Sequence, residues 1–245
     1  MINADLYLLA VIGRERAGDD DAPYRVRRQM EPLLRAWAGA RLEAVTLSGS
    51  YPKATALRGS DVDLLVSLAP ETPGSLAEVH AGLAAHFRDY AARPRNVSVR
   101  VQFQWASVDL VPARRRAGST VHTLWQMRYG TWLQTDVGEQ IRYVRSSGLL
   151  DEILALKIWR RRNVLRFPSF LLELAVLRAL RPGRGVSRSF LEMLEFLASE
   201  FVGARLVDPV NSNNVVSDAL TVEEKSRIAG AAEMSLRAAS WAEIL

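Results

Sequence analysis

The stretch LSGSYPKATALRGSDVDLLVSL, residues 47–68, constrains this chain more than any other part of it. Asp61 and Asp63 lie on a predicted apolar strand, residues 61–67, that reads as buried. Residues two apart on a strand point to the same face, roughly 7 Å apart along the backbone. Two carboxylates on one buried face are costly unless a cation lies between them. The stretch therefore predicts a cation site.

A second strand is expected to supply a third carboxylate. Apolar and polar residues alternate from Val97 to Trp105, which is typical of a half-buried strand, and Asp109 follows in VDLVP. Three carboxylates on neighbouring strands would hold two hard cations, as in phosphoryl transfer by two metal ions. Oxygen ligands in a chain without cysteine favour Mg²⁺ or Mn²⁺ over zinc.

Gly49 and Ser50 precede the two aspartates and form a predicted turn between strands 42–48 and 61–67. Glycine lets backbone N–H groups approach a phosphate, and a serine hydroxyl can donate to it as well. Either motif alone is a weak signal, because G-S turns and D-x-D pairs are common. Together they predict a site where a hydroxyl attacks the α-phosphorus of a nucleoside triphosphate and pyrophosphate leaves.

The remaining pattern predicts an α+β chain. A helix from Pro23 to about Gly39 comes before the strands, and another covers residues 75–91. After about residue 130 we expect helices only, including 150–166, 168–180, 187–202 and one opened by a capping box at Thr221 and Glu224. A mixed core followed by a helical half is expected.

Composition excludes some classes of protein. The chain has 245 residues, a net charge of +5 and no cysteine, so it has no disulfide framework. No apolar run approaches the roughly 20 residues that span a bilayer. The first sixteen residues lack the features of a signal peptide, and we expect a cytoplasmic protein. Arginine clusters at 114–116 and 160–162 indicate either attraction to polyanions or a solvated face.

GSYPKATALRGSDVDLLV and VDLVP resemble the signature of the DNA polymerase β nucleotidyltransferase superfamily. The resemblance implies a polymerase β-like core, a mixed or antiparallel sheet with helices, packed on a helical domain. It implies that Asp61, Asp63 and Asp109 are catalytic and bind two Mg²⁺ or Mn²⁺ ions. Gly49, Ser50, Lys53 and Thr55 would bind the nucleotide. Ala54 departs from the family pattern, which usually has glycine there.

The helical half resembles a narrower group. EILALKIWRRRNVLRFPSFLLELAVLRAL is similar to the segment after the core in 2'-5' oligoadenylate synthetases, cGAS/DncV-like nucleotidyltransferases and archaeal CCA-adding enzymes. A lysine and a serine bind the triphosphate there, and these roles fall to Lys157 and Ser169. VDPVNSNNVVSDAL resembles an Asp-Pro and Asn-Asn segment of the group. TWLQTDVGEQIRYV, residues 131–144, resembles the helix that connects the two halves.

These resemblances imply three parts: an N-terminal helical segment (1–40) packing on both halves, a catalytic core (41–130) and a helical domain (131–245). The leading hypothesis is a nucleotidyltransferase that makes a linear or cyclic oligonucleotide signal from NTPs, with ATP favoured, as bacterial relatives in antiviral defence do. The alternatives are nucleotide addition to an RNA 3' end, and transfer onto a protein or small molecule. RNA is a candidate acceptor or activator. The sequence leaves base preference, linkage, product length and oligomeric state open.

Overall fold

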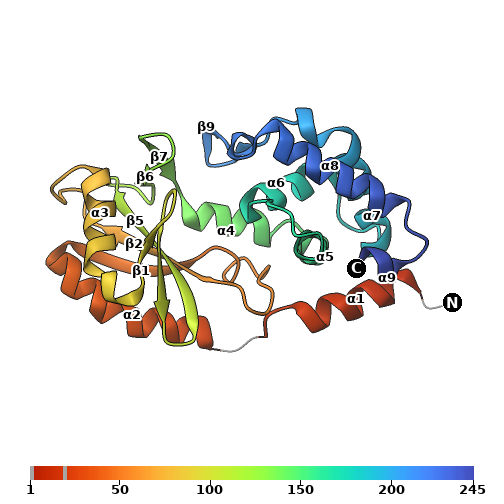
Figure 1. Cartoon of the computed structure of the whole chain (residues 1–245). Coiled ribbons are helices and arrows are strands. Elements are labelled where there is room, and N and C mark those ends of the chain that lie inside the picture. The colour runs from red at the N-terminus through yellow and green to blue at the C-terminus, as the bar shows by residue number, and fades with distance from the viewer. Residues whose placement is uncertain (1–2, 19–20) are drawn as a thin grey trace. The chain divides into compact units, whose positions relative to one another are not determined.

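The computed structural model describes residues 3–18 and 21–245 of the chain. They divide into two compact units (Figure 1). The sheet unit contains the described residues up to 53 that follow residue 18, together with 59–141. The helical unit contains 3–18, 54–58 and 142–245. Residues 1–2 and 19–20 of the expected segment 1–40 lie outside the described residues, and the division at 40 and 130 stays a prediction.

A mixed sheet forms the centre of the sheet unit. Among the described residues its strand order is β1-β2-β5-β4-β3, and β6 and β7 extend it from β5. In the described part of the sheet, β2 and β5 run parallel to each other and the other neighbouring strands are antiparallel. The strands are β1 Leu42–Ser48, β2 Val62–Leu68, β3 Arg93–Pro94, β4 Val99–Phe103, β5 Ala106–Arg115, β6 His122–Gln126 and β7 Thr131–Thr135.

Two helices cover one face of this sheet. α2 (Ala22–Ala38) and α3 (Leu76–His86) share one hydrophobic cluster with alternate residues of β2, β4 and β5. Leu64, Val101 and Leu110 are fully buried in that cluster. Because side chains alternate along a strand, the polar residues between them face the opposite side of the sheet. This opposite face carries the carboxylates.

The ends of α2 follow from its sequence. Pro23 lies in the first turn, where the missing N–H costs nothing, and Gly39 ends the helix with φ +60°. This agrees with the helix expected from Pro23 to about Gly39. α3 begins at a capping box in which Ser75 and Glu78 bond each other's backbone N–H groups. Short 3₁₀ helices follow α2 and α3 at Gly39–Arg41 and Arg88–Tyr90.

The helical unit packs around α5 (Leu150–Arg162). Every residue from Ile153 to Trp159 is buried, so α5 is enclosed by its neighbours. The other helices are α1 (Ala4–Glu15), α6 (Ser169–Ala179), α7 (Val186–Ser199), α8 (Val222–Leu236) and α9 (Trp241–Ile244). Short 3₁₀ helices lie at Phe201–Gly203 and Val216–Ala219. The expected capping box at Thr221 and Glu224 opens α8.

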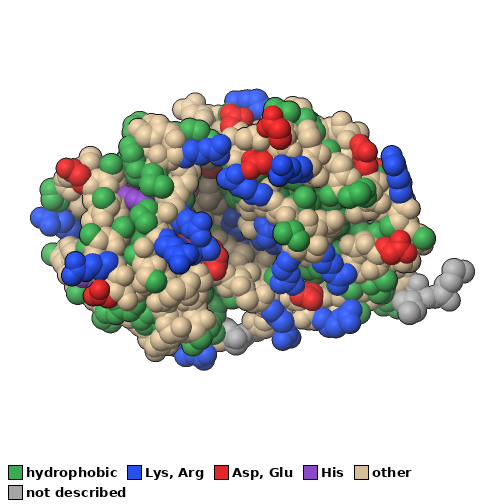
Figure 2. Space-filling view, in the orientation of Figure 1, with side chains coloured by type: hydrophobic (Ala, Val, Ile, Leu, Met, Phe, Trp, Pro, Cys, Tyr) green, Lys and Arg blue, Asp and Glu red, His purple; other side chains and the backbone are tan. Residues whose placement is uncertain are grey.

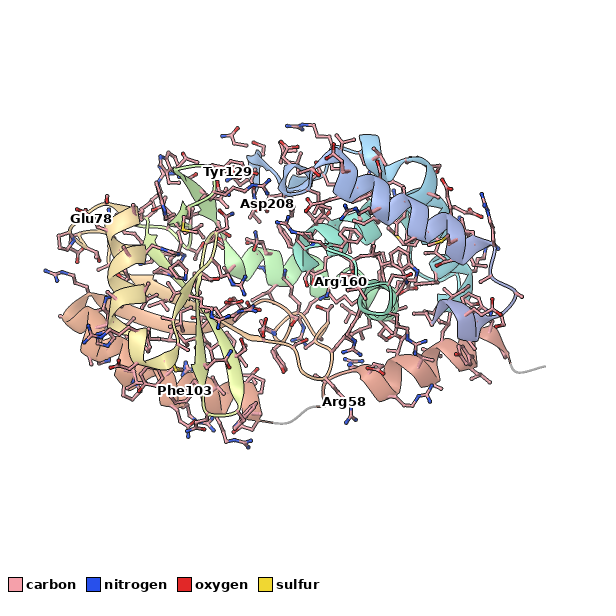
Figure 3. The ribbon with its side chains drawn as sticks, in the orientation of Figure 1. Arg58, Glu78, Phe103, Tyr129, Arg160 and Asp208 are labelled. Atoms are coloured by element: carbon pink, nitrogen blue, oxygen red, sulfur yellow. The ribbon has the colours of Figure 1, made fainter. Side chains whose placement is uncertain are left out.

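Five residues that follow the glycine-serine turn belong to the helical unit. We call this segment, residues 54–58, the strap. The backbone N–H of Arg58 donates to the carbonyl of Glu15 at 2.7 Å, and the N–H of Ala17 donates to the carbonyl of Ala56 at 3.0 Å. Arg58 consequently lies beside the end of α1 (Figure 3). The chain therefore leaves the sheet unit after Lys53 and returns to it at Gly59.

A buried ion pair fixes the strap to the helices. The ammonium of Lys157 on α5 donates to Glu173 on α6 at 2.7 Å and to the hydroxyl of Thr55 at 2.9 Å. The Thr55 hydroxyl in turn lies 3.1 Å from the Glu173 carboxylate. All three side chains are almost completely buried. Because buried charges are tolerated only when paired and hydrogen-bonded, each member of this cluster depends on the others.

Three local expectations were wrong. Asp109 does not end the strand at 97–105: the chain turns back at Gln104 and Trp105, and Asp109 lies within β5. The region after residue 130 is not purely helical, since β6 and β7 form a hairpin and residues 207–215 form a second one, β8 (Val207–Asp208) with β9 (Asn211–Val215).

The third error concerns the connecting helix expected at 131–144. Its first five residues are strand β7, and α4 covers Val137–Arg145. Thr131, Trp132 and Thr135 are β-branched or aromatic residues that favour a strand, and pairing with β6 satisfies their backbone groups. In the described part of the chain, no helix combines the length and the apolar character needed to cross a membrane.

We expect Lys157→Met to destabilise the protein by about 3–5 kcal/mol, because it leaves the Glu173 carboxylate buried without its cation. The double variant Lys157→Met/Glu173→Leu should recover part of this loss, since it removes both charges. Urea unfolding followed by circular dichroism measures both. Lys225→Met, on α8, is the matched control and should change stability little. Equal stability of Lys157→Met and the wild type would contradict the structural role of the pair.

Candidate active site

The three predicted carboxylates meet on the side of the sheet that faces away from α2 and α3. Asp63 on β2 and Asp109 on β5 are directly opposite each other in the parallel register. Asp61 comes just before the first residue of β2, two positions from Asp63. Asp109 is thus placed by β5, the strand that pairs with β2. The sequence identified the residue, although the strand assigned to it was wrong.

Gly49 is required by its contact with Asp63. Its φ is +67°, a conformation in which side chains with a Cβ are strained. A Cβ on Gly49 would also lie 1.9 Å from Oδ2 of Asp63, well inside contact distance. Ser48, the last residue of β1, pairs with Asp63 in the sheet. The turn therefore lies directly against the carboxylate of Asp63. Ser50, the next residue of the turn, is partly exposed.

Asp63 has an unusually high pKa for a carboxylate. The pKa of Asp63 is raised from the ordinary 3.8 to about 7, first by burial and then by the charges of Asp109 and Asp61. Lys53 and Arg100 oppose this rise by their positive charge. Near neutral pH, Asp63 is therefore held between its protonated and ionised forms, which is the state expected of a carboxylate that lacks a sufficient counter-charge.

Arg100 lies among the three carboxylates, and the sequence analysis missed it. It is opposite Asp109 in the β4–β5 register. Its Nε donates to Oδ1 of Asp109 at 3.1 Å, and one terminal nitrogen donates to Oδ2 of Asp109 at 2.6 Å and also to Asp61. The alternation along residues 97–105 was the available signal, because it places Arg100 on the polar face. The partner strand was unknown, so the contact could not be found.

The three carboxylates are suitable ligands for a hard divalent cation, but their present positions do not form a complete metal site. Among the described residues, no three aspartate, glutamate or histidine side chains converge on one metal position. Arg100 accounts for this, because its guanidinium occupies the space between Asp61 and Asp109. Carboxylate oxygens are the ligands that Mg²⁺ or Mn²⁺ prefers, and three of them are available here. One of the three, Asp63, has a raised pKa and lies against Gly49, where there is no room for a Cβ.

The other predicted nucleotide-binding residues fall in both units. Lys53 is in the sheet unit, buried and close enough to Asp63 to lower its pKa. Thr55 and Lys157 are in the helical unit, where they contact each other and Glu173. Ser169 is exposed in the first turn of α6 and accepts a hydrogen bond from Arg160 at 3.1 Å. The binding of phosphate by these four residues stays a prediction.

The Asp-Pro and Asn-Asn segment forms the β8–β9 hairpin of the helical unit. Asp208 is buried and accepts from the backbone N–H of Val210 and from the side-chain amide of Asn214, each at 3.1 Å. These bonds close the hairpin. Asp208 therefore has a structural role within this hairpin.

Several arginines of the two clusters make internal bonds. Arg115 binds both carboxylate oxygens of Glu43, at 2.6 and 2.7 Å, and Arg161 pairs with Glu15. Arg160 donates to the carbonyl of Phe167 at 2.7 Å. On the face shown in Figure 2, lysine and arginine side chains are scattered among acidic ones. The arginine content is therefore explained in part by structural ion pairs.

A family model matches the region that contains the candidate site. Residues 28–113 match the model of the nucleotidyltransferase domain, and this range contains the glycine-serine turn and all three carboxylates. The expected resemblance to polymerase β-like nucleotidyltransferases and the expectation of an enzyme are thereby confirmed. No curated protein matches the chain closely enough to be called a relative.

Solved structures extend the likeness beyond the matched domain. CdnC of E. coli MS115-1 with ATP is 21% identical, with a TM-score of 0.75 over 94% of this chain and 90% of that one. CdnG of Bradyrhizobium diazoefficiens, a CD-NTase in complex with GTP, is 14% identical, with a TM-score of 0.74 over 96% and 91%. Cid1 poly(U) polymerase is 12% identical, with a TM-score of 0.65 over 97% and 95%. At these identities the likeness establishes the fold, and the α+β fold class is confirmed.

We expect Gly49→Ala to reduce nucleotidyl transfer by at least about a hundredfold, because the new Cβ displaces the Asp63 carboxylate. Initial rates of pyrophosphate release on the folded variant measure this. Gly59→Ala is the matched control: Gly59 also has a positive φ, +76°, but a Cβ there meets nothing within 4 Å. Both variants lose some stability through strain. Similar activities would contradict the importance of the contact with Asp63.

The raised pKa of Asp63 predicts a pH-dependent cost of folding. Between pH of about 4 and 7 the folded state keeps a proton that the unfolded chain has lost, so the free energy of unfolding falls as the pH rises through this range. Without metal, Asp63→Asn should therefore gain stability relative to the wild type between pH 5 and pH 8. Urea unfolding in EDTA at both values tests this.

The control for that measurement is Asp89→Asn, since Asp89 is highly exposed and pairs with Arg88 at 3.7 Å. Its stability relative to the wild type should not change in this way with pH. A difference between Asp63→Asn and the wild type that is the same at pH 5 and pH 8 would show that the folded protein does not hold this proton.

Proposed function

We propose that this protein transfers a nucleotidyl group from a nucleoside triphosphate to a hydroxyl acceptor and releases pyrophosphate. The observation that carries this is the row of Asp61, Asp63 and Asp109, with Asp63 against Gly49, within the range that matches a nucleotidyltransferase domain. Such a row has no evident structural value, because it lowers the stability of the sheet that contains it. The presence of this costly row beside the glycine-serine turn supports a catalytic role.

The proposed reaction balances as a single displacement. The acceptor oxygen forms a bond to the α-phosphorus, the bond between that phosphorus and the bridging oxygen breaks, and pyrophosphate departs with the bond electrons. Asp109 accepts the proton of the attacking hydroxyl, as a general base. The Gly49–Ser50 turn and Lys53 receive the β- and γ-phosphates through N–H, hydroxyl and ammonium donors. Because positioning is most of the catalysis of phosphoryl transfer, fixed donors of this kind suffice for the protein's part.

Asp61, Asp63 and Asp109 would hold the divalent ions, Mg²⁺ or Mn²⁺. One similar structure, that of Cid1 poly(U) polymerase, contains Mg with 3'-dATP. When bound, two ions would neutralise the charge that develops on the α-phosphate and the leaving pyrophosphate. Ser169 and the ammonium of Lys157 are further proposed ligands of the triphosphate. For Lys157 this role requires a change of partner, since it now donates to Glu173.

The product we favour is a linear or cyclic oligonucleotide signal. The support is the similarity to CdnC and CdnG over more than nine-tenths of this chain, and those structures contain ATP and GTP respectively. Another similar structure is a CdnE cyclic dinucleotide synthase of Elizabethkingia meningoseptica, 14% identical. We propose ATP as one substrate, antiviral signalling as the process and the NTP-containing cytoplasm as the location. A protein partner is a further candidate, since CdnC also forms a complex with a HORMA protein.

Addition of nucleotides to an RNA 3' end is the second candidate. The specific observation that favours it is the likeness to Cid1 poly(U) polymerase, which extends over 97% of this chain. Both candidates use the same donor chemistry and differ in the acceptor. The acceptor is the ribose hydroxyl of another NTP in the first case and of an RNA end in the second.

The two candidates are separated by supplying acceptors one at a time. The purified protein is incubated with four NTPs labelled at the α-phosphate and with Mg²⁺ or Mn²⁺, with and without bulk tRNA. Products are resolved by chromatography and mass spectrometry, and pyrophosphate is measured in parallel. We expect short oligonucleotides without RNA, and their absence from Asp63→Asn.

Label found only on RNA would replace the signal hypothesis with the terminal-transferase one. Label on the protein itself, or on a small molecule, would replace both. A folded protein that releases no pyrophosphate with any acceptor or metal would contradict nucleotidyl transfer. Gly59→Ala should give the wild-type products, which shows that loss of product in Asp63→Asn is specific to the site.

A further inference from the structure

Arg100 donates hydrogen bonds to carboxylates that a metal ion would need as ligands, so these bonds would have to break before the ion could bind. Its guanidinium contacts both oxygens of Asp109 and one oxygen of Asp61. A divalent ion such as Mg²⁺ lies about 2.0–2.1 Å from its carboxylate oxygens. The terminal nitrogen of Arg100 lies 2.6 Å from Oδ2 of Asp109. An ion bound to that oxygen and the present guanidinium would therefore occupy nearly the same space, with charges of the same sign.

The guanidinium is a stable occupant of this position. Arginine stays charged at any physiological pH, and its planar fork matches carboxylate oxygens. Arg100 is partly buried, its side chain being 27% exposed, and that of Asp109 is 13% exposed. The backbone keeps the residue in place, because β4 pairs with β5 and sets Arg100 opposite Asp109. The contact is therefore set by the strand register.

We propose that Arg100 is a positioning residue that acts as a tethered counter-ion: it fills the acidic site before metal binds and must leave the carboxylates when metal arrives. This inference rests on the proposed function, since it assumes that Asp61, Asp63 and Asp109 bind divalent ions. Arg100 supports the folded sheet in the absence of metal and lowers the affinity for free metal. The metal without nucleotide then binds weakly, and the site is completed when metal and triphosphate arrive together.

This role differs from that of a simple structural ion pair. An arginine that only stabilised the fold would lower stability when removed and leave metal affinity unchanged or reduced. A tethered counter-ion gives the opposite sign for metal affinity, because its removal abolishes the competition. The two readouts, stability without metal and affinity for metal, must therefore move in opposite directions.

The test measures Mn²⁺ binding to the full-length protein without nucleotide, using the electron paramagnetic resonance signal of free Mn²⁺. Arg100→Gln should bind Mn²⁺ on the order of tenfold more tightly than the wild type, which corresponds to the loss of charge-assisted bonds that the ion would have to break. In EDTA the same variant should unfold at a lower temperature. Arg100→Lys keeps the charge but not the fork, and should give an intermediate affinity.

Arg93→Gln is the matched control. Arg93 is directly opposite Arg100 in the β3–β4 register and is exposed, so its removal takes the same charge from the next strand. Its Mn²⁺ affinity should stay near that of the wild type. If both glutamine variants bound Mn²⁺ more tightly by the same factor, general charge would explain the effect and the proposal for Arg100 would be wrong.

The outcomes also separate this proposal from the metal site itself. Unchanged or weaker Mn²⁺ binding by Arg100→Gln, with binding still abolished by Asp63→Asn, would overturn the role of Arg100 and leave the metal site intact. Mn²⁺ binding that is the same in the wild type and Asp63→Asn would overturn the proposed metal site. If Arg100→Gln does not fold, Arg100→Lys decides: an affinity no higher than that of the wild type would overturn the proposal.

Discussion

The sheet unit depends on keeping three negative charges close together on one face of a folded sheet. Asp63 and Asp109 are neighbours on parallel strands, and Asp61 is two residues away. Burial, and then repulsion by Asp109 and Asp61, raise the pKa of Asp63 to about 7, while Lys53 and Arg100 act in the opposite direction. The other face of these strands contributes apolar residues to a cluster shared with α2 and α3. Burial of that apolar surface offsets the cost of the acidic row.

The backbone beside the three carboxylates tolerates few substitutions. Gly49 has no room for a Cβ because Asp63 lies against it. A few residues later the chain enters the strap, which the buried Lys157–Glu173 pair and α1 hold within the helical unit. The strap is followed by Asp61 and β2. In the sequence, the turn and the D-x-D strand are thus joined through a segment that belongs to the other unit.

Much of the site was readable from the sequence, since glycine, serine and paired aspartates have local spacing that needs no knowledge of strand order. The fold class followed from the same pattern. What could not be read was which strands pair. Asp109 was placed on the wrong strand, and Arg100 was overlooked, because both depend on the β4–β5 hairpin that turns at Gln104 and Trp105. Ala54 was recognised as a departure from a glycine pattern, and its φ of +61° shows why glycine suits that position.

The central claim is that Asp61, Asp63 and Asp109 form the metal-dependent centre for nucleotidyl transfer. It is tested most directly by a crystal structure of the protein with Mn²⁺ and an ATP analogue that cannot be cleaved between the α- and β-phosphates. Anomalous scattering would locate manganese independently of any model. We predict that manganese is bound to these three carboxylates, with the triphosphate against the Gly49–Ser50 turn. Manganese and nucleotide bound elsewhere, with the carboxylates still held by Arg100, would contradict it.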